Sequence, residues 1–205
     1  MRPASEEELV RLVSDDLEDT GNVLTYSDWL LERGRRRGEL IVLDVALESA
    51  IVPRRAELER ARAELLETHA TELLGETMAS VVREGYAQIT WRRGFVDTLA
   101  YQGVGLRHRK AVGWLVAALA AESAAFRFLR ALSLRNTDLL DLEPLLRFTN
   151  LVELDIAQTA VTDVRPLASL PRLEAVHLAG CAVGPRERHW LEERGVRVSY
   201  SNDGT

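Results

Sequence analysis

The C-terminal part of the chain repeats itself every 22 residues, and this repeat constrains the fold more than any other feature. The stretch "LRALSLRNTDLLDLEPLLRFTN" (129–150) aligns with "LVELDIAQTAVTDVRPLASLPR" (151–172) and with "LEAVHLAGCAVG" (173–184). Such a period indicates stacked units, each of which needs a neighbour to bury its apolar side. The superposed apolar positions are Leu129, Leu151 and Leu173; Leu132, Leu154 and Val176; and Leu134, Ile156 and Leu178.

Each copy carries the spacing L-x-x-L-x-L, which predicts a short strand followed by a turn. Thr137, Thr159 and Cys181 share the turn position, where a small side chain with a hydrogen-bond donor suits buried backbone carbonyls. Pro144 and Pro166 also align. Beyond the turn, we therefore expect an irregular or 3₁₀ limb that leads back to the next strand.

The segments on either side of the repeats extend the same pattern. "VDTLAY" (96–101) has the strand spacing, and "AQITWRRGFV" (87–96) predicts a preceding strand that turns at Gly94. The Ala-rich segment 106–126 predicts a helix within the first return limb. The segment Pro185 to Tyr200 predicts a terminal helix followed by a last parallel strand.

The N-terminal segment has no alternating apolar runs and shows helix punctuation throughout. Ser5 followed by Glu8 forms a capping box, which marks the start of a first short helix. We expect the following helices to run from a cap at Asn22 to Gly34, from Gly38 to Ile51, and from Pro53 to Leu74.

These patterns predict two domains, a helical one over residues 1–82 and a repeat one over residues 83–205. The fold class is α+β, with a short α/β solenoid whose parallel sheet is capped by the helical domain. A link of about ten residues is too short for a freely tumbling domain. We therefore expect residues 1–82 to cover the first strand and the chain to unfold as one unit.

The repeats resemble the leucine-rich repeat in its 22-residue bacterial form. In addition, "LTYSDWLLERGRRRGELIVLDVAL" (24–47) resembles the repeat-companion domain at the N-termini of bacterial leucine-rich repeat proteins. The shared motif is tyrosine-small-Asp-Trp-Leu, then Glu-Arg-Gly, then Arg-Gly-Glu and an apolar helix. Arg35 departs from it, because the family more often has an aspartate there. The resemblance implies an interaction scaffold and supplies no reaction.

The aromatic cluster of this motif has a structural interpretation of its own. Tyr26, Trp29 and Leu30 lie three and four residues apart, so one helical face can bury them together while Asp28 faces elsewhere. A catalytic carboxylate would need a second acid, a histidine or a metal ligand at a fixed offset, and none follows. We expect these side chains to form core.

The composition of the chain indicates which kinds of partner and which cellular compartment to expect. A net charge of -6 disfavours a nucleic-acid binder, which needs clustered basic residues. The single cysteine excludes an internal disulfide framework, which favours the cytoplasm. The longest apolar run, "WLVAALAA" (114–121), is too short to cross a membrane. The histidines show no paired ligand spacing, so we expect no metal and no cofactor.

The predicted function is non-catalytic binding of a protein partner, for which a basic partner is the natural complement. In a parallel sheet the side chains between the buried positions form columns on the concave face. The expected columns are Ser133, Asp155 and His177; Ala131, Glu153 and Ala175; and Arg135, Ala157 and Ala179. The predicted partner-binding residues are Arg130, Ser133, Arg135, Glu153, Asp155, Glu174 and His177.

The sequence leaves two alternatives open. His177 precedes Cys181 by four residues and stands one turn from Asp155, so either pair could form the centre of a Cys-dependent transferase or regulator. The apolar stripe of the fourth helix, which includes Leu58 and Leu65, could instead mediate self-association of a structural scaffold.

Overall fold

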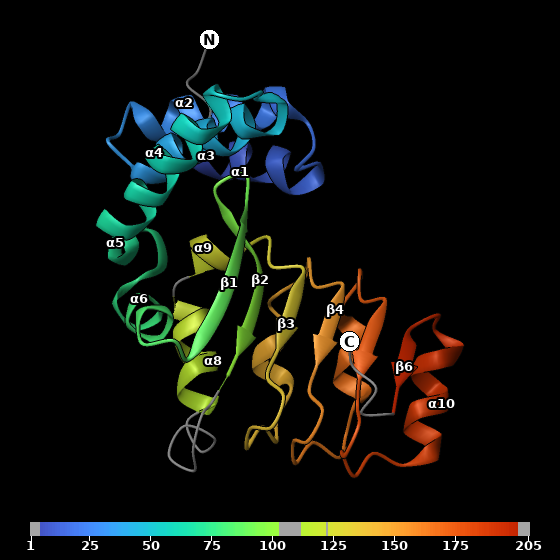
Figure 1. Cartoon of the computed structure of the whole chain (residues 1–205). Helices are drawn as coiled ribbons and strands as arrows, with labels where there is room; N and C mark the ends of the chain where they lie inside the picture. Colours follow the sequence, from blue (N-terminus) through green and yellow to red (C-terminus); the bar gives the residue numbers. More distant parts are fainter. Residues whose placement is uncertain (1–4, 103–111, 122, 201–205) are drawn as a thin grey trace. The chain divides into compact units, whose positions relative to one another are not determined.

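The structure is a computed structural model of the 205-residue chain, and it describes residues 5–102, 112–121 and 123–200. The chain divides into two compact units. The first comprises Met1–Glu76 together with Trp91–Phe95, and the second comprises Thr77–Thr90 together with Val96–Thr205. Figure 1 shows helices in the first unit and a sheet with helices and short limbs in the second.

The first two helices of the first unit both begin at side-chain caps. Helix α1 (Glu6–Asp15) has the predicted capping box, because Ser5 Oγ accepts the Glu8 N–H at 3.2 Å and Glu8 Oε2 accepts the Ser5 N–H at 2.9 Å. Helix α2 (Thr20–Leu31) is capped by Asp19, so the prediction of Asn22 as the cap was wrong. Asp19 Oδ1 accepts the N–H groups of Gly21 and Asn22 at 2.9 and 3.1 Å. Asn22 therefore lies inside the first turn of the helix and is not its cap.

The next predicted helix has slightly different ends in the structure, and the one after it is divided in two. Helix α3 spans Arg36–Ser49, and the expected single helix from Pro53 to Leu74 is two helices, α4 (Arg54–Thr68) and α5 (Ala70–Leu74). The break occurs at His69, whose backbone leaves the helical region at φ -114° and ψ 22°.

The apolar stripe of the fourth predicted helix is buried within this unit. Leu58 and Leu65 are each 8% exposed and Leu73 is 2% exposed. Leu65 and Leu73 form a core cluster with Leu40, against which Trp91 packs. These leucines are therefore part of the core of the helical unit.

Two of the three side chains of the aromatic cluster of α2 are core, as predicted, and the third, Trp29, is partly buried. Tyr26 and Leu30 are each 5% exposed, while Asp28 is exposed. The Tyr26 ring stacks on Trp29 at 6.2 Å and on Phe95 at 6.4 Å between centroids.

A tight turn at Arg93 and Gly94 completes the first unit. Both residues have positive φ, 48° and 82°, as a type I′ hairpin turn requires. The Arg93 side chain is 6% exposed, and its Nε and Nη2 donate to the Glu48 carboxylate at 2.6 and 2.7 Å. The Gly94 N–H donates to buried Asp44 at 2.7 Å. Arg93 also donates to the Leu17 carbonyl at 2.7 Å and to the Thr20 hydroxyl at 3.3 Å. These four side-chain hydrogen bonds hold an arginine in a conformation that usually requires Asn or Gly.

The second unit is built around a six-stranded sheet in the order β1 to β6 (Figure 1). Strands β1 and β2 are joined by the two-residue turn and confirm the predicted strand-and-turn pair. The elements in chain order are α6 (Glu76–Arg83), β1 (Ala87–Arg92), β2 (Phe95–Tyr101), α8 (Val112–Ala121), α9 (Ser123–Phe126), β3 (Ala131–Ser133), η1 (Glu143–Leu145), β4 (Glu153–Asp155), η2 (Arg165–Ser169), β5 (Ala175–His177), α10 (Pro185–Glu193) and β6 (Arg197–Ser199).

Strands β2 to β6 are parallel, and the register of β3 to β6 advances by the predicted 22 residues. Leu132 pairs with Leu154, Leu154 with Val176, and Val176 with Val198. The return limbs contain the predicted 3₁₀ turns, each with its proline in the first turn. Figure 1 shows the limbs gathered on one face of the sheet. Mixed helices with a mostly parallel sheet agree with the expected α+β class.

The turn after each strand is also repeated, down to single hydrogen bonds. Thr137 Oγ1 donates to the Leu134 carbonyl at 2.6 Å, and Thr159 Oγ1 donates to the Ile156 carbonyl at 2.7 Å, as predicted for this position. The preceding residues occupy the left-handed region in all three copies, with φ of 60° at Asn136, 58° at Gln158 and 76° at Gly180.

Helix α8 confirms the predicted helix in the first return limb. Its side chains Val112, Leu115, Val116 and Leu119 are all buried, whereas the predicted start at residues 106–111 lies outside the described residues. Within the residues that the structure describes, no helix is long and apolar enough to cross a membrane. The predicted terminal helix and last strand are present as α10 and β6.

Candidate protein-binding face

One face of the sheet packs against the limbs and the other carries the predicted columns. Leu132, Leu154 and Val176 are at most 1% exposed, so their side chains point into the core. Because side chains alternate along a strand, the residues between them point to the opposite face. The register places the first column, Ser133, Asp155 and His177, in line, and likewise the second, Ala131, Glu153 and Ala175.

A shallow groove of about 310 Å³ lies on this face. Strands β2 and β3 contribute mostly small side chains, strands β4 and β5 contribute Glu153, Asp155 and His177, and Arg135 follows β3. The lining residues are Thr98, Leu99, Ala100, Ala131, Leu132, Ser133, Arg135, Glu153, Asp155 and His177. Five of the seven predicted partner-binding residues therefore meet in one hollow.

Two carboxylates dominate the groove, and each already has a partner. Asp155 Oδ2 accepts the Ser133 hydroxyl at 3.2 Å, and its Oδ1 accepts the Ala157 N–H at 2.9 Å. Glu153 Oε1 lies 2.9 Å from His177 Nε2. The Glu153 side chain remains 52% exposed and that of His177 36%. A ligand can reach both acids, but it must compete with these contacts.

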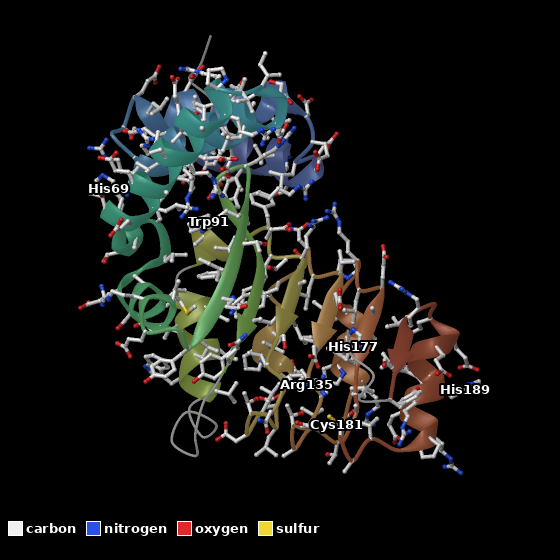
Figure 2. All side chains as sticks on the ribbon, in the orientation of Figure 1. His69, Trp91, Arg135, His177, Cys181 and His189 are labelled. Carbon is white, nitrogen blue, oxygen red and sulfur yellow. The ribbon has the colours of Figure 1, made fainter. Side chains whose placement is uncertain are left out.

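The other two predicted residues lie outside the groove. Arg130 precedes β3 and forms a two-pronged ion pair with Asp97 of β2, with Nε–Oδ1 at 2.6 Å and Nη2–Oδ2 at 3.1 Å. This hydrogen bond to Asp97 raises the pKa of Arg130 above its usual value. Glu174 occupies the equivalent position before β5 and is exposed. Arg135 lines the groove at the end of β3, and Figure 2 shows its position relative to His177.

The third predicted column contributes less surface than expected. Ala157 is fully buried and Ala179 is 3% exposed. The backbone ladder continues past the strands here, because Asn136 N–H donates to the Ala157 carbonyl at 2.8 Å and Gln158 N–H to the Ala179 carbonyl at 2.7 Å. Of this column, only Arg135 is not buried.

Three groove or rim residues of β2 were missed from the sequence. Thr98 pairs with Ala131 and Ala100 with Ser133, so both extend the columns by one strand. Asp97 holds Arg130. The sequence indicated two of them, because Thr98 and Ala100 alternate with the buried Leu99 in "VDTLAY" and therefore lie on the same face as the columns.

The groups considered for catalysis have other partners. Cys181 aligns with Thr137 and Thr159, but its Sγ donates to the Ile156 carbonyl of the preceding repeat at 2.9 Å and lies 3.4 Å from Thr159 Oγ1. His177, on the strand, contacts Glu153. Figure 2 shows Cys181 in the loop beyond the sheet. Among the described residues, no group of three or more His, Cys, Asp or Glu side chains could hold a metal ion.

Comparisons with known proteins add little to this geometry. No family model matches the chain, and no curated protein matches it, so the resemblance to the companion domain stays a prediction. Among solved structures, the chain is similar to internalin C2 of Listeria monocytogenes, with 29% sequence identity and a TM-score of 0.34. The match covers 41% of this chain and 35% of that one.

Proposed function

We propose that the chain is a leucine-rich repeat interaction module, preceded by a companion domain, that binds a protein partner on the concave face of its sheet. One observation carries the proposal. The sheet is covered by limbs on one face, while the other face carries an open groove lined from three neighbouring strands and part of β2. The proposal assigns no reaction and no cofactor to the chain.

The chemistry of the groove favours a basic partner. Glu153 and Asp155 point to the same face of β4 and are both reachable from solvent. Complementary charge speeds encounter and fixes register at protein interfaces. A partner segment that carries arginine or lysine side chains supplies this complement.

The test is affinity capture from the native cell with a charge-reversed variant as comparison. The double variant Glu153→Arg with Asp155→Arg should lose the partner that the wild-type protein retains. A matched control, Glu143→Arg with Glu193→Arg, reverses two exposed acids on a return limb and on α10 and should retain it.

Equal thermal melting of both double variants would establish that they are folded. Capture of the same protein by the concave-face variant, at wild-type yield, would show that the partner binds elsewhere.

A further inference from the structure

We propose that the groove receives an arginine side chain of the partner, and that this cation displaces His177 from Glu153, so that binding is coupled to release of a proton. The inference rests on the proposed function and adds to it the recognised side chain and its regulation by pH. Three features of the groove support it: its shape, its charges and the position of the imidazole.

The shape of the groove suits a long, thin side chain with a charged end. Thr98, Ala100 and Ala131 form a floor of short side chains on β2 and β3. The aliphatic stem of an arginine can lie along such a floor while the charged head reaches beyond it. At the far side of the floor stand the two carboxylates of β4.

The charges favour a guanidinium at that side. Planar guanidinium groups bind carboxylates with two parallel hydrogen bonds, a geometry that lysine cannot reproduce. Asp155 and Glu153 are two residues apart on one strand, which places their Cα atoms about 6.6 Å apart. Arginines at alternate positions of an extended peptide have the same spacing, so one peptide can address both acids.

His177 is the competitor for the second acid. Its Nε2 lies 2.9 Å from Glu153 Oε1, in the position that an incoming cation would need. Among the described residues, the charged groups that neighbour His177 on this face lie on the adjacent strands and in the groove. They are Glu153 and Asp155 of β4, Arg197 of β6, which stands opposite Ala175 in the register, and Arg135 after β3.

The sign of the pH effect follows from this competition. A histidine side chain changes its charge between pH 5 and 8. When protonated, His177 neutralises Glu153 and repels a second cation; when neutral, it yields the carboxylate. Binding of an arginine therefore favours the neutral imidazole and releases a proton, so affinity rises with pH. One released proton allows at most about a tenfold gain in affinity per pH unit.

The experiment uses the full chain and a defined probe, the peptide acetyl-Ala-Arg-Ala-Arg-Ala-amide, observed by NMR. Resonances of Ser133 and Asp155 should shift on titration, and a peptide with citrulline in place of arginine should leave them unmoved. Affinity for the arginine peptide should be lower at about pH 5.5 than at about pH 7.5, by at most about tenfold per pH unit. In His177→Gln this fall should disappear.

His189→Gln is the matched control, because it removes another imidazole from an exposed position on α10, where the ring pairs with Glu192 and Glu193. The pH dependence should survive in this variant. Wild-type and His177→Gln proteins with the same pH dependence would overturn the proton coupling and leave the proposed function standing. An arginine peptide that fails to move the groove resonances at either pH would overturn the inference as a whole, whereas the proposed function is decided separately by the capture experiment.

Discussion

Gly94 provides the sharpest test of how the hairpin turn is held in the helical unit. Its φ is 82°, and a Cβ at this position would lie 2.3 Å from Ile41 Cγ1 and 3.2 Å from the Ile41 backbone nitrogen. The glycine is therefore required twice, by its left-handed backbone and by the close approach of α3. The replacement Gly94→Ala separates these requirements when it is compared with a glycine that has only the first.

The expected magnitude follows from the two terms. A left-handed conformation costs an L-residue about 1 to 2 kcal/mol, and overpacking a core costs about 1 to 3 kcal/mol more. Gly94→Ala should thus lower the free energy of unfolding by about 2 to 5 kcal/mol. Gly34 has φ 66° with nothing within 4 Å of its Cβ position, so Gly34→Ala should cost only the first term.

Urea unfolding followed by tryptophan fluorescence measures both variants, because Trp29 and Trp91 lie in this unit. The slope of the free energy against urea concentration should stay constant in both, so that the midpoints report stability. Equal losses in Gly94→Ala and Gly34→Ala would refute the close approach of Gly94 to Ile41 as a determinant of stability.

Three further predictions concern the core, the thiol and the N-terminal segment. Leu154→Ala, at a fully buried position of β4, should lower the free energy of unfolding by about 2 to 5 kcal/mol, whereas Leu140→Ala, 70% exposed, should change it by less than about 0.5 kcal/mol in the same urea titration. Cys181 should react slowly with iodoacetamide in the native protein and quickly in urea, because its thiol is bound to a backbone carbonyl; fast native labelling would contradict this assignment. Removal of residues 1–82 takes away the helices that form one unit with Trp91–Phe95, so the remaining chain should aggregate. A remaining chain that is soluble, monomeric and melts sharply would contradict this prediction.

The repeated part of the fold was predictable because one physical constraint recurs in it. Each strand buries the same side-chain positions, and in two of the three turns a threonine hydroxyl donates to the carbonyl three residues before it. Leu132, Leu154 and Val176 pair as their alignment predicted. The columns of the open face follow from that register without further information.

The helical unit was less predictable because its boundaries depend on choices between similar residues. Asp19 and Asn22 are both good caps, and only the folded chain shows which side chain meets the free N–H groups. The break at His69 could not be predicted, because neither proline nor glycine occurs at this position. Arg93 in a left-handed turn is stabilised by Glu48, 45 residues away, which no local pattern contains.

The candidate site was also predictable only in part. The sequence predicted which residues share a face, but it did not predict that His177 would bind Glu153 on the diagonal, or that Asp97 would hold Arg130. These pairs depend on side-chain rotamers across strands rather than on spacing along one strand. The pair between His177 and Glu153 is also a contact that a ligand of Glu153 must displace.

The most direct test of the concave-face proposal is site-specific photo-crosslinking in the native cell. A photoreactive residue at position 131, on the floor of the groove, is compared with one at position 168, which is exposed on the 3₁₀ limb of the opposite side. We predict one protein adduct from position 131 that disappears when Glu153→Arg and Asp155→Arg are added, and no such adduct from position 168. The same adduct from both positions, or an adduct from position 168 alone, would contradict binding on the concave face.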